Sequence, residues 1–325
     1  MNKPSHPNRH VSDLIDRIKE SADKLESQGS TRGDLKIISR SMRELAYAFK
    51  VFTPYRKYRK VTVFGSARTK PDQPAYQMAV DFGRSMAEHD WLVITGAAAG
   101  IMEAGHVGAG REHSMGLNIL LPFEQDANPV IAGDEKLVHM KYFFTRKLMF
   151  VKECDAVVCL PGGFGTLDEA MEVLTLNQTG KHDPVPVVFL DAPGGTYWKT
   201  FDDFLKRELL GGGMISPDDP ALYMVTDNCE EAVQECVQFY RVYHSMRYVG
   251  DQLVLRLKSP LSETALQHIV DNFSSIVVSG TFEQTAALPA EKNEPDLADM
   301  QRLVFQFDRR NLAQLRLLIN YINSQ

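Results

Sequence analysis

Pro161-Gly162-Gly163-Phe164-Gly165-Thr166-Leu167-Asp168-Glu169 joins a predicted strand to a predicted helix. The apolar run 155–160 before it predicts a buried strand, and residues 166–178 after it predict a helix with Thr166 at its cap. In such a turn, backbone N–H groups point outward at the positive end of the helix dipole, and glycines let a phosphate approach. A carboxylate is costly to place beside an anion site for binding alone. We therefore predict an anion-binding site here and interpret Glu169 as a reacting group.

Regular alternation of strands and helices surrounds this stretch, from about Val61 to Tyr248. Apolar runs predict strands at 61–64, 91–95, 117–121, 155–160, 185–190 and 222–226. Helical patterns lie between and after them, at 74–88, 100–111, 141–153, 166–178, 197–209 and 229–243. The alternation predicts an α/β fold, a Rossmann-like doubly wound parallel sheet with helices on both faces. The ligand is expected beyond the carboxyl ends of the strands, where the chain order reverses.

Small residues follow several of the predicted strands. Gly65 and Ser66 follow the first strand, and Gly96, Gly100 and Met102 follow the second. Together with the turn residues Gly162, Gly163, Gly165 and Thr166, they are expected to hold one ligand from several sides.

The chain is expected to contain three parts. Residues 1–55 form an N-terminal helical extension, residues 56–248 the nucleotide-binding domain, and residues 249–325 a small C-terminal α+β module. The predicted β-α-β-β-α order of this module resembles an ACT-like or ferredoxin-like unit. It contains no glycine-rich phosphate loop, so we expect it to provide packing, oligomer contacts or effector sensing and not the chemistry.

Composition narrows the class of protein. The 325 residues include 44% hydrophobic and 24% charged residues, which is typical of a globular protein. A net charge of −6 argues against a general nucleic-acid binder. No apolar run reaches the roughly 18 residues that span a bilayer, and no signal peptide is apparent. The four cysteines lack C-x-x-C spacing and are interpreted as reduced core thiols. We expect a cytoplasmic protein without nucleic-acid or membrane partners.

Basic residues occur in two notable segments. Arg146 and Lys147 lie among apolar residues of the predicted helix 141–153, a poor place for solvated charges. The planar fork of Arg146 suits a phosphate or carboxylate, and Lys147 is a flexible point charge. The second segment, residues 55–60, interleaves tyrosines with arginines and lysines. It is interpreted as an exposed connector, with an anionic ligand or nucleic acid as the alternative.

Three segments together resemble the LOG (Lonely Guy) family. Arg146-Lys147 and residues 161–169 match its paired R-K and P-G-G-x-G-T-x-x-E motifs, and residues 100–104 match its G-I-M-E-A segment. The resemblance covers about residues 60–243. Members of this family are phosphoribohydrolases, which cleave a purine nucleoside 5′-monophosphate to free base and ribose 5-phosphate. Some release active cytokinins. Many carry an older lysine decarboxylase label, for which this sequence shows no pyridoxal-type lysine context.

The resemblance also implies residue roles. Arg146 and Glu169 would be catalytic, and the 5′-phosphate would lie on the glycine-rich turn. Lys147, Asp168 and Thr175 match family positions that line the same pocket. An ionised Glu169 would stabilise positive charge on the ribose, hold its hydroxyls or activate water. No metal or other cofactor is implied, and the partner is a small nucleotide.

Two features leave alternatives open. The family often has Gly-Gly-Gly-x-Gly after its second strand, whereas this chain has Gly96-Ala97-Ala98-Ala99-Gly100. Alanines penalise positive φ, so the loop approaches the ligand less closely or the pocket binds something different. The main alternative is a protein of the same fold that binds a nucleotide or carries a phosphorylated cofactor without turnover, as molybdenum cofactor carriers do. A third interpretation makes the C-terminal module the working part.

The helix predicted over 141–153 carries more apolar residues than one buried face can use, Phe143, Phe144 and Leu148 among them. We therefore expect a homodimer or a higher homo-oligomer, as the resemblance also implies.

Overall fold

The computed structural model describes residues 9–121 and 126–325, so the first residues of the expected N-terminal extension lie outside the described part. The chain divides into two compact units, residues 1–50 and residues 51–325. Helices α1 (Arg9–Ser27) and α2 (Arg32–Phe52) form the first unit, except for the last two residues of α2. Thr31 and Asp34 cap α2 reciprocally, because Thr31 N donates to Asp34 Oδ2 at 3.0 Å and Asp34 N donates to Thr31 Oγ1 at 3.2 Å. A 3-10 turn, Thr53–Tyr55, follows α2.

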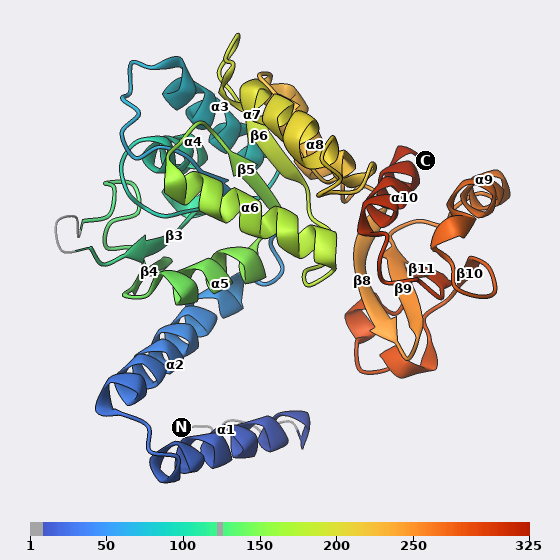
Figure 1. Cartoon of the computed structure of the whole chain (residues 1–325), viewed down its shortest axis with the longest axis horizontal. Helices are drawn as coiled ribbons and strands as arrows, with labels where there is room; N and C mark the ends of the chain where they lie inside the picture. The colour runs from blue at the N-terminus through green and yellow to red at the C-terminus, as the bar shows by residue number, and fades with distance from the viewer. Residues whose placement is uncertain (1–8, 122–125) are drawn as a thin grey trace. The chain divides into compact units, whose positions relative to one another are not determined.

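A parallel sheet forms the centre of the second unit (Figure 1). Its strands are β1 (Lys60–Phe64), β2 (Leu92–Thr95), β3 (Ser114–Ile119), β4 (Leu137–Met140), β5 (Ala156–Cys159), β6 (Val187–Leu190) and β7 (Met224–Thr226). The order is β4-β3-β2-β1-β5-β6-β7, and every neighbouring pair is parallel. The chain order reverses between β1 and β5, which confirms the expected doubly wound arrangement.

Helices cover both faces of this sheet. They are α3 (Pro74–Glu88), α4 (Ile101–His113), α5 (Phe143–Glu153), α6 (Phe164–Thr179), α7 (Tyr197–Phe204) and α8 (Cys229–Gln238). Helix α3 packs against both α4 and α8, over a core that includes Val61 and Val63 of β1. On the opposite face, the Phe64 ring lies 4.9 Å from the ring of Phe150 on α5. Because residues alternate along β1, its two faces bury different helices.

Several predicted boundaries are wrong. Helix α6 begins at Phe164 with Gly163 as its N-cap, not with Thr166 at the cap, because the glycines themselves supply the turn. The helix expected over 229–243 ends at Gln238, and β8 (Tyr243–Val249) follows. Strand β4 was not predicted. Helix α7 continues as a π-helix, Leu205–Leu210, and a 3-10 turn, Asp219–Leu222, precedes β7.

The C-terminal module contains an antiparallel sheet. Strands β8 (Tyr243–Val249), β9 (Gln252–Leu257), β10 (Glu283–Thr285) and β11 (Gln301–Phe305) pair in the order β10-β11-β9-β8, with helices α9 (Glu263–Phe273) and α10 (Leu312–Ser324). The order along the chain is β-β-α-β-β-α, so the expected β-α-β-β-α order misses the first strand. A 3-10 turn (Ser274–Ile276) follows α9, and an isolated bridge joins Val277 to Phe307. Further 3-10 turns are Pro289–Glu291 and Pro295–Leu297.

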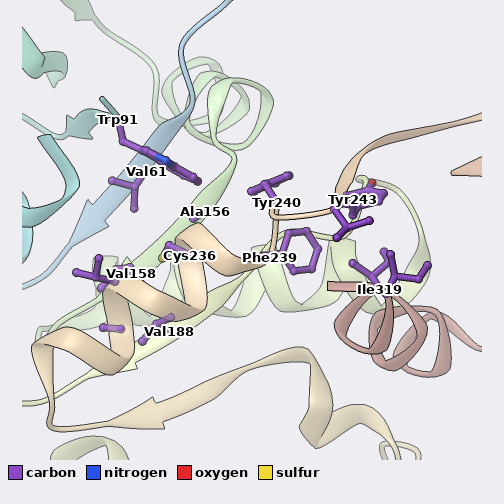
Figure 2. Close-up of a cluster of buried hydrophobic side chains, with 14 of the residues drawn as sticks. Val61, Trp91, Ala156, Val158, Val188, Cys236, Phe239, Tyr240, Tyr243 and Ile319 are labelled. Carbon is purple, nitrogen blue, oxygen red and sulfur yellow. The ribbon is translucent and has the colours of Figure 1, made fainter. Parts of the chain in front are cut away.

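One hydrophobic core continues from the parallel sheet into this module. Figure 2 shows Trp91, Phe239, Tyr240 and Tyr243 in line between the strands and Ile319 of α10. Asn323, near the end of α10, accepts hydrogen bonds from Val242 N and Tyr243 N, each at 2.9 Å. The module therefore packs directly against the parallel-sheet domain through a shared hydrophobic core. No helix of the described residues is long and apolar enough to cross a membrane.

Candidate active site

A cavity of about 720 Å³ lies at the carboxyl ends of β1, β2, β3 and β5, where the sheet order reverses. Doubly wound folds bind ligands in this position. Ten of the fourteen predicted site residues line the cavity, namely Gly65, Ser66, Gly96, Met102, Arg146, Gly162, Gly163, Gly165, Thr166 and Glu169.

The glycine-rich turn presents bare backbone to this cavity. A Cβ on Gly163 or Gly165 would meet no atom within 4 Å, so a ligand has room to approach both residues. Gly162 has a different role, because a Cβ there would lie 2.1 Å from Thr166 Oγ1. The first hydrogen bonds of α6 run from Thr166 N and Leu167 N to the Gly163 carbonyl, at 3.1 and 3.2 Å, so the N–H groups of residues 163–165 precede them and need partners from outside the helix. Helix dipole, free donors and the Thr166 hydroxyl together form a site for an anion.

Backbone hydrogen bonds hold the loops around the cavity together. Ser66 N donates to the Pro161 carbonyl at 3.1 Å, and the Ser66 carbonyl accepts from Ile101 N at 3.0 Å. Gly65 and Gly100 allow this close packing, since a Cβ on Gly65 would strike Ile101 and one on Gly100 would lie 2.3 Å from the Ser66 carbonyl oxygen. Gly100 therefore supports the site without lining it.

The alanine-containing loop after β2 adopts the strained geometry that its sequence disfavours. Ala97 has φ of +60° and is fully buried. A left-handed conformation costs an L-residue about 1–2 kcal/mol. Two hydrogen bonds hold it there: Ala97 N donates to Thr95 Oγ1 at 2.9 Å, and the Ala97 carbonyl accepts from Asn128 N at 2.8 Å. The loop thus keeps its turn despite the alanines, and Ala98 lines the cavity.

Arg146 and Glu169 face this cavity from neighbouring helices. Arg146 comes from α5 and Glu169 from α6, and Glu169 is only 6% exposed. Burial raises the pKa of Glu169 to about 7, although the charges of Lys147 and Arg146 act in the opposite direction. Burial also lowers the pKa of Arg146, against the charge of Glu169. A carboxyl group that titrates near neutral pH is suited to proton transfer.

Three buried polar atoms of this cavity have no hydrogen-bond partner among the described residues. They are Arg146 Nε, Glu169 Oε2 and Asn118 Oδ1. Buried polar atoms are normally paired, and each unpaired one costs about 1–3 kcal/mol. Their concentration in one cavity indicates that a polar ligand completes them.

Lys147, Asp168 and Thr175 do not line the cavity. Lys147 Nζ pairs with Asp168 Oδ2 at 2.6 Å and with Glu172 Oε2 at 2.8 Å, which ties α5 to α6. Burial acts to lower the pKa of Lys147, but these hydrogen bonds raise it above its usual value. Thr175 is exposed, and its hydroxyl donates to the Met171 carbonyl at 2.8 Å. The pair Lys147–Asp168 therefore positions the helices that carry Arg146 and Glu169.

Sequence reasoning missed other lining residues, among them Arg68, Asn118, Phe143 and Phe164. Phe164 is 93% exposed although it lies inside the glycine-rich stretch, which is a signal for contact with a ligand or a partner. Asn118 lies at the end of β3 and is 4% exposed. Only its polarity within the apolar run 117–121 distinguished it. Among the described residues, no three His, Cys, Asp or Glu side chains are grouped as in a metal site.

Comparison with known proteins identifies related sequences. A protein-family model described as "Possible lysine decarboxylase" matches residues 96–236. The cytokinin riboside 5′-monophosphate phosphoribohydrolase LOG3 of Arabidopsis thaliana is 33% identical over 192 residues, which span 56% of this chain and 84% of that relative. LOG7 of the same plant is 31% identical and is covered over 83% of its length, again by 56% of this chain.

Among solved structures, the molybdenum cofactor binding protein from Rippkaea orientalis has 20% identity and a TM-score of 0.38, over 55% of this chain and 94% of that one. At this level the similarity carries no argument about function. The two plant relatives, by contrast, are matched over most of their length. The chain belongs to the LOG family.

Proposed function

We propose that this protein hydrolyses the N-glycosidic bond of a purine nucleoside 5′-monophosphate, giving free base and ribose 5-phosphate. The observation that carries the proposal is Glu169, a buried carboxyl with one unpartnered oxygen beside an anion-binding helix N-terminus. The relatives that share these motifs are named as phosphoribohydrolases of a nucleoside 5′-monophosphate, which supports the same reaction class.

The phosphate would occupy the N-terminus of α6. Gly163 and Gly165 leave space there, and Thr166 and Arg68 also line the cavity. Ribose would then extend toward Glu169, which lies one turn further along α6. Arg146 faces the same space from α5. Binding energy from the phosphate would thus position the sugar, a part of the substrate remote from the bond that breaks.

Cleavage transfers the electrons of the C1′–N bond to the base and leaves positive charge on the ribose ring. Ionised Glu169 would stabilise this charge, and it would also accept the proton of the water that attacks C1′. Water supplies the new C1′–O bond, and the base departs with one proton. The Arg146 charge would keep part of the Glu169 population ionised near neutral pH.

A panel of nucleotides tests the proposal. Purified protein is incubated with AMP, GMP, IMP and cytokinin riboside 5′-monophosphates, and free base is measured by liquid chromatography. We expect release of base from at least one monophosphate and much slower release from the matching nucleoside. Equal rates for nucleotide and nucleoside would contradict the phosphate site. Tight nucleotide binding without turnover would instead favour the cofactor or nucleotide carrier.

We also propose that the protein is a homodimer that uses α5. Phe143, Phe144 and Leu148 on this helix are 58%, 56% and 47% exposed, so the apolar surface expected from the sequence lacks cover in the single chain. Light scattering at micromolar concentration should give twice the chain mass. A monomer at that concentration would contradict the assignment, and Phe144→Glu should shift a dimer toward monomer.

A further inference from the structure

A second cavity, of about 440 Å³, lies at the opposite end of the parallel sheet. Its walls come from Arg59 before β1, Asp155 before β5, residues 181–185 before β6 and residues 243–245 of β8. Ligands of doubly wound sheets normally bind at the carboxyl ends of the strands, where the first cavity lies. The second cavity exists because the C-terminal module places its first strand at the amino ends.

Arg59 is fixed in this cavity by three contacts. Its Nη1 pairs with Asp155, and its Nη2 donates to the His244 carbonyl at 2.8 Å. Its guanidinium carbon also lies 3.8 Å from the centre of the Tyr240 ring, one of the aromatic residues in Figure 2. A cation already held in place loses little conformational freedom when it binds an anion. Arg59 belongs to the basic segment 55–60, which the catalytic site does not use.

The charges around His244 favour an anion. Burial, followed by the charges of Arg59, Lys258 and Arg256, lowers the pKa of His244 to about 4, against the opposite effect of Asp155. The imidazole is therefore neutral at pH 7 and lies in a positive electrostatic potential. The Asp155 carboxylate is already engaged by Arg59 and by Lys60 N, the latter at 2.9 Å.

Further cationic groups line the entrance. Lys181 is exposed on the segment after α6, and Lys152 lies on the last turn of α5, where it pairs with Glu153 at 2.5 Å. His182 belongs to the same wall, and Asp183 adds one acidic group. The wall thus combines a fixed guanidinium, two lysines, of which Lys152 is paired with Glu153, and two imidazoles with the carboxylates of Asp155 and Asp183.

We propose that this second cavity binds a small organic phosphate as an effector. Its volume of about 440 Å³ lies within the usual range of pockets for small molecules and accommodates a sugar phosphate. Binding at this cavity does not depend on the reaction at the first cavity, whereas the effector role rests on the proposed function.

Two helices connect the cavities. Helix α5 carries Arg146 and ends at Glu153, directly before the wall residues Cys154 and Asp155. Helix α6 carries Glu169 and ends at Thr179, directly before the wall segment 181–185. A ligand that shifts the ends of these helices moves the catalytic side chains, so we expect its occupancy to change nucleotide turnover.

The test uses the full-length protein and glucose 6-phosphate, which is not a product of the proposed reaction. The His244 imidazole resonance, assigned through His244→Gln, is followed by NMR while the pH is varied. We expect glucose 6-phosphate to raise the pKa of His244 by about one unit or more, as a nearby negative charge does. Free glucose should have no effect. If glucose 6-phosphate leaves the pKa of His244 unchanged, the cavity does not bind it and the proposed site is wrong. If inorganic phosphate raises the pKa equally, the site does not select an organic phosphate.

Variants locate the binding and separate it from catalysis. Lys181→Gln should weaken the glucose 6-phosphate response about fivefold or more, as loss of a charged partner does. The matched control Lys292→Gln, an exposed lysine elsewhere in the C-terminal module, should not change it. Unchanged affinity in Lys181→Gln would overturn the placement. In Glu169→Gln, glucose 6-phosphate should still raise the pKa of His244. The binding test therefore remains valid even if the proposed hydrolysis is wrong. If nucleotide turnover is the same with and without saturating glucose 6-phosphate, the effector role is wrong.

Discussion

Glu169 of the cavity at the carboxyl ends of the parallel strands and Glu291 of the C-terminal module are buried to almost the same degree, at 6% and 4% exposed. Their surroundings differ completely. Glu169 keeps one oxygen without a partner among the described residues, and burial raises its pKa to about 7. Burial acts on Glu291 in the same direction, but hydrogen bonds from Arg302, Leu288 N and Arg256 outweigh it and hold the pKa below its usual value.

The Glu291 network has a clear structural purpose. Arg256 of β9 and Arg302 of β11 are directly opposite each other in the antiparallel pair, where like charges repel. Glu291 bridges them, accepting from Arg256 Nε at its Oε1 and from Arg302 Nε at its Oε2, each at 2.9 Å. It thereby ties the 3-10 turn Pro289–Glu291 to β9 and β11. The comparison shows two uses of a buried carboxylate. One whose oxygens all accept hydrogen bonds from the protein stabilises the fold, whereas one with an unpaired oxygen beside a cavity is suited to contact a ligand.

The largest expected effect comes from Glu291→Gln. Removing the charge leaves two buried arginines opposed, which should lower the free energy of unfolding by about 3–5 kcal/mol. Urea denaturation measures this. The control is Glu294→Gln, whose carboxylate is 39% exposed and pairs with Arg247 at 2.9 Å and with Arg256, which keeps its bond to Glu291 in this variant. It should cost less than about 1 kcal/mol. Similar losses in both variants would remove the distinction between buried and exposed members of the network.

Glu169→Gln should reduce activity strongly and stability little, which is the opposite of Glu291→Gln. Loss of the carboxylate should reduce kcat/KM for the nucleotide by about 100-fold or more, while the unfolding midpoint stays near that of the wild type. The effect on stability is small because Glu169 Oε2 has no hydrogen-bond partner among the described residues. Glu112→Gln, at an exposed position of α4, serves as the matched control for activity. Near-normal turnover in Glu169→Gln would move the chemistry to another residue.

The pH profile gives the smallest and most specific test. If the ionised form of Glu169 acts, kcat/KM should rise roughly tenfold per pH unit below its pKa of about 7 and level off above it. Glu169→Gln should lose this limb. A profile that falls as pH rises through 7 would show that the protonated carboxyl is the active form. Glu291→Gln, measured at a temperature where it is folded, should keep the wild-type profile.

The residues that line the first cavity agree in part with those predicted from the sequence. Gly163, Gly165, Thr166, Arg146 and Glu169 all line it, as predicted. Each belongs to a short pattern whose strand and helix periods are local. Lys147 and Thr175 were expected there too, but both side chains point elsewhere, and helix phase alone did not reveal this. Their roles remain implied only by the family resemblance.

Helix and strand boundaries failed for a related reason. The apolar pattern of 229–243 continues smoothly, so nothing local marks the end of α8 at Gln238 or the start of β8 at Tyr243. That change is imposed by pairing with β9 and by Asn323, about 80 residues away in the chain, which accepts from Val242 N and Tyr243 N. Tertiary contacts of this kind override local propensity.

The sequence by itself determined the alternating α/β order, and it predicted that the glycine-rich turn and Glu169 belong to one site, because these features depend on neighbours within a few residues. Only the tertiary structure decided that Asn118 completes the catalytic cavity, that Glu291 neutralises two opposed arginines, and that Arg59, Asp155 and His244 enclose a second cavity. Each of these arrangements brings together residues far apart in the chain. Their burial, and hence their charge and pairing, is set by packing that no local pattern records.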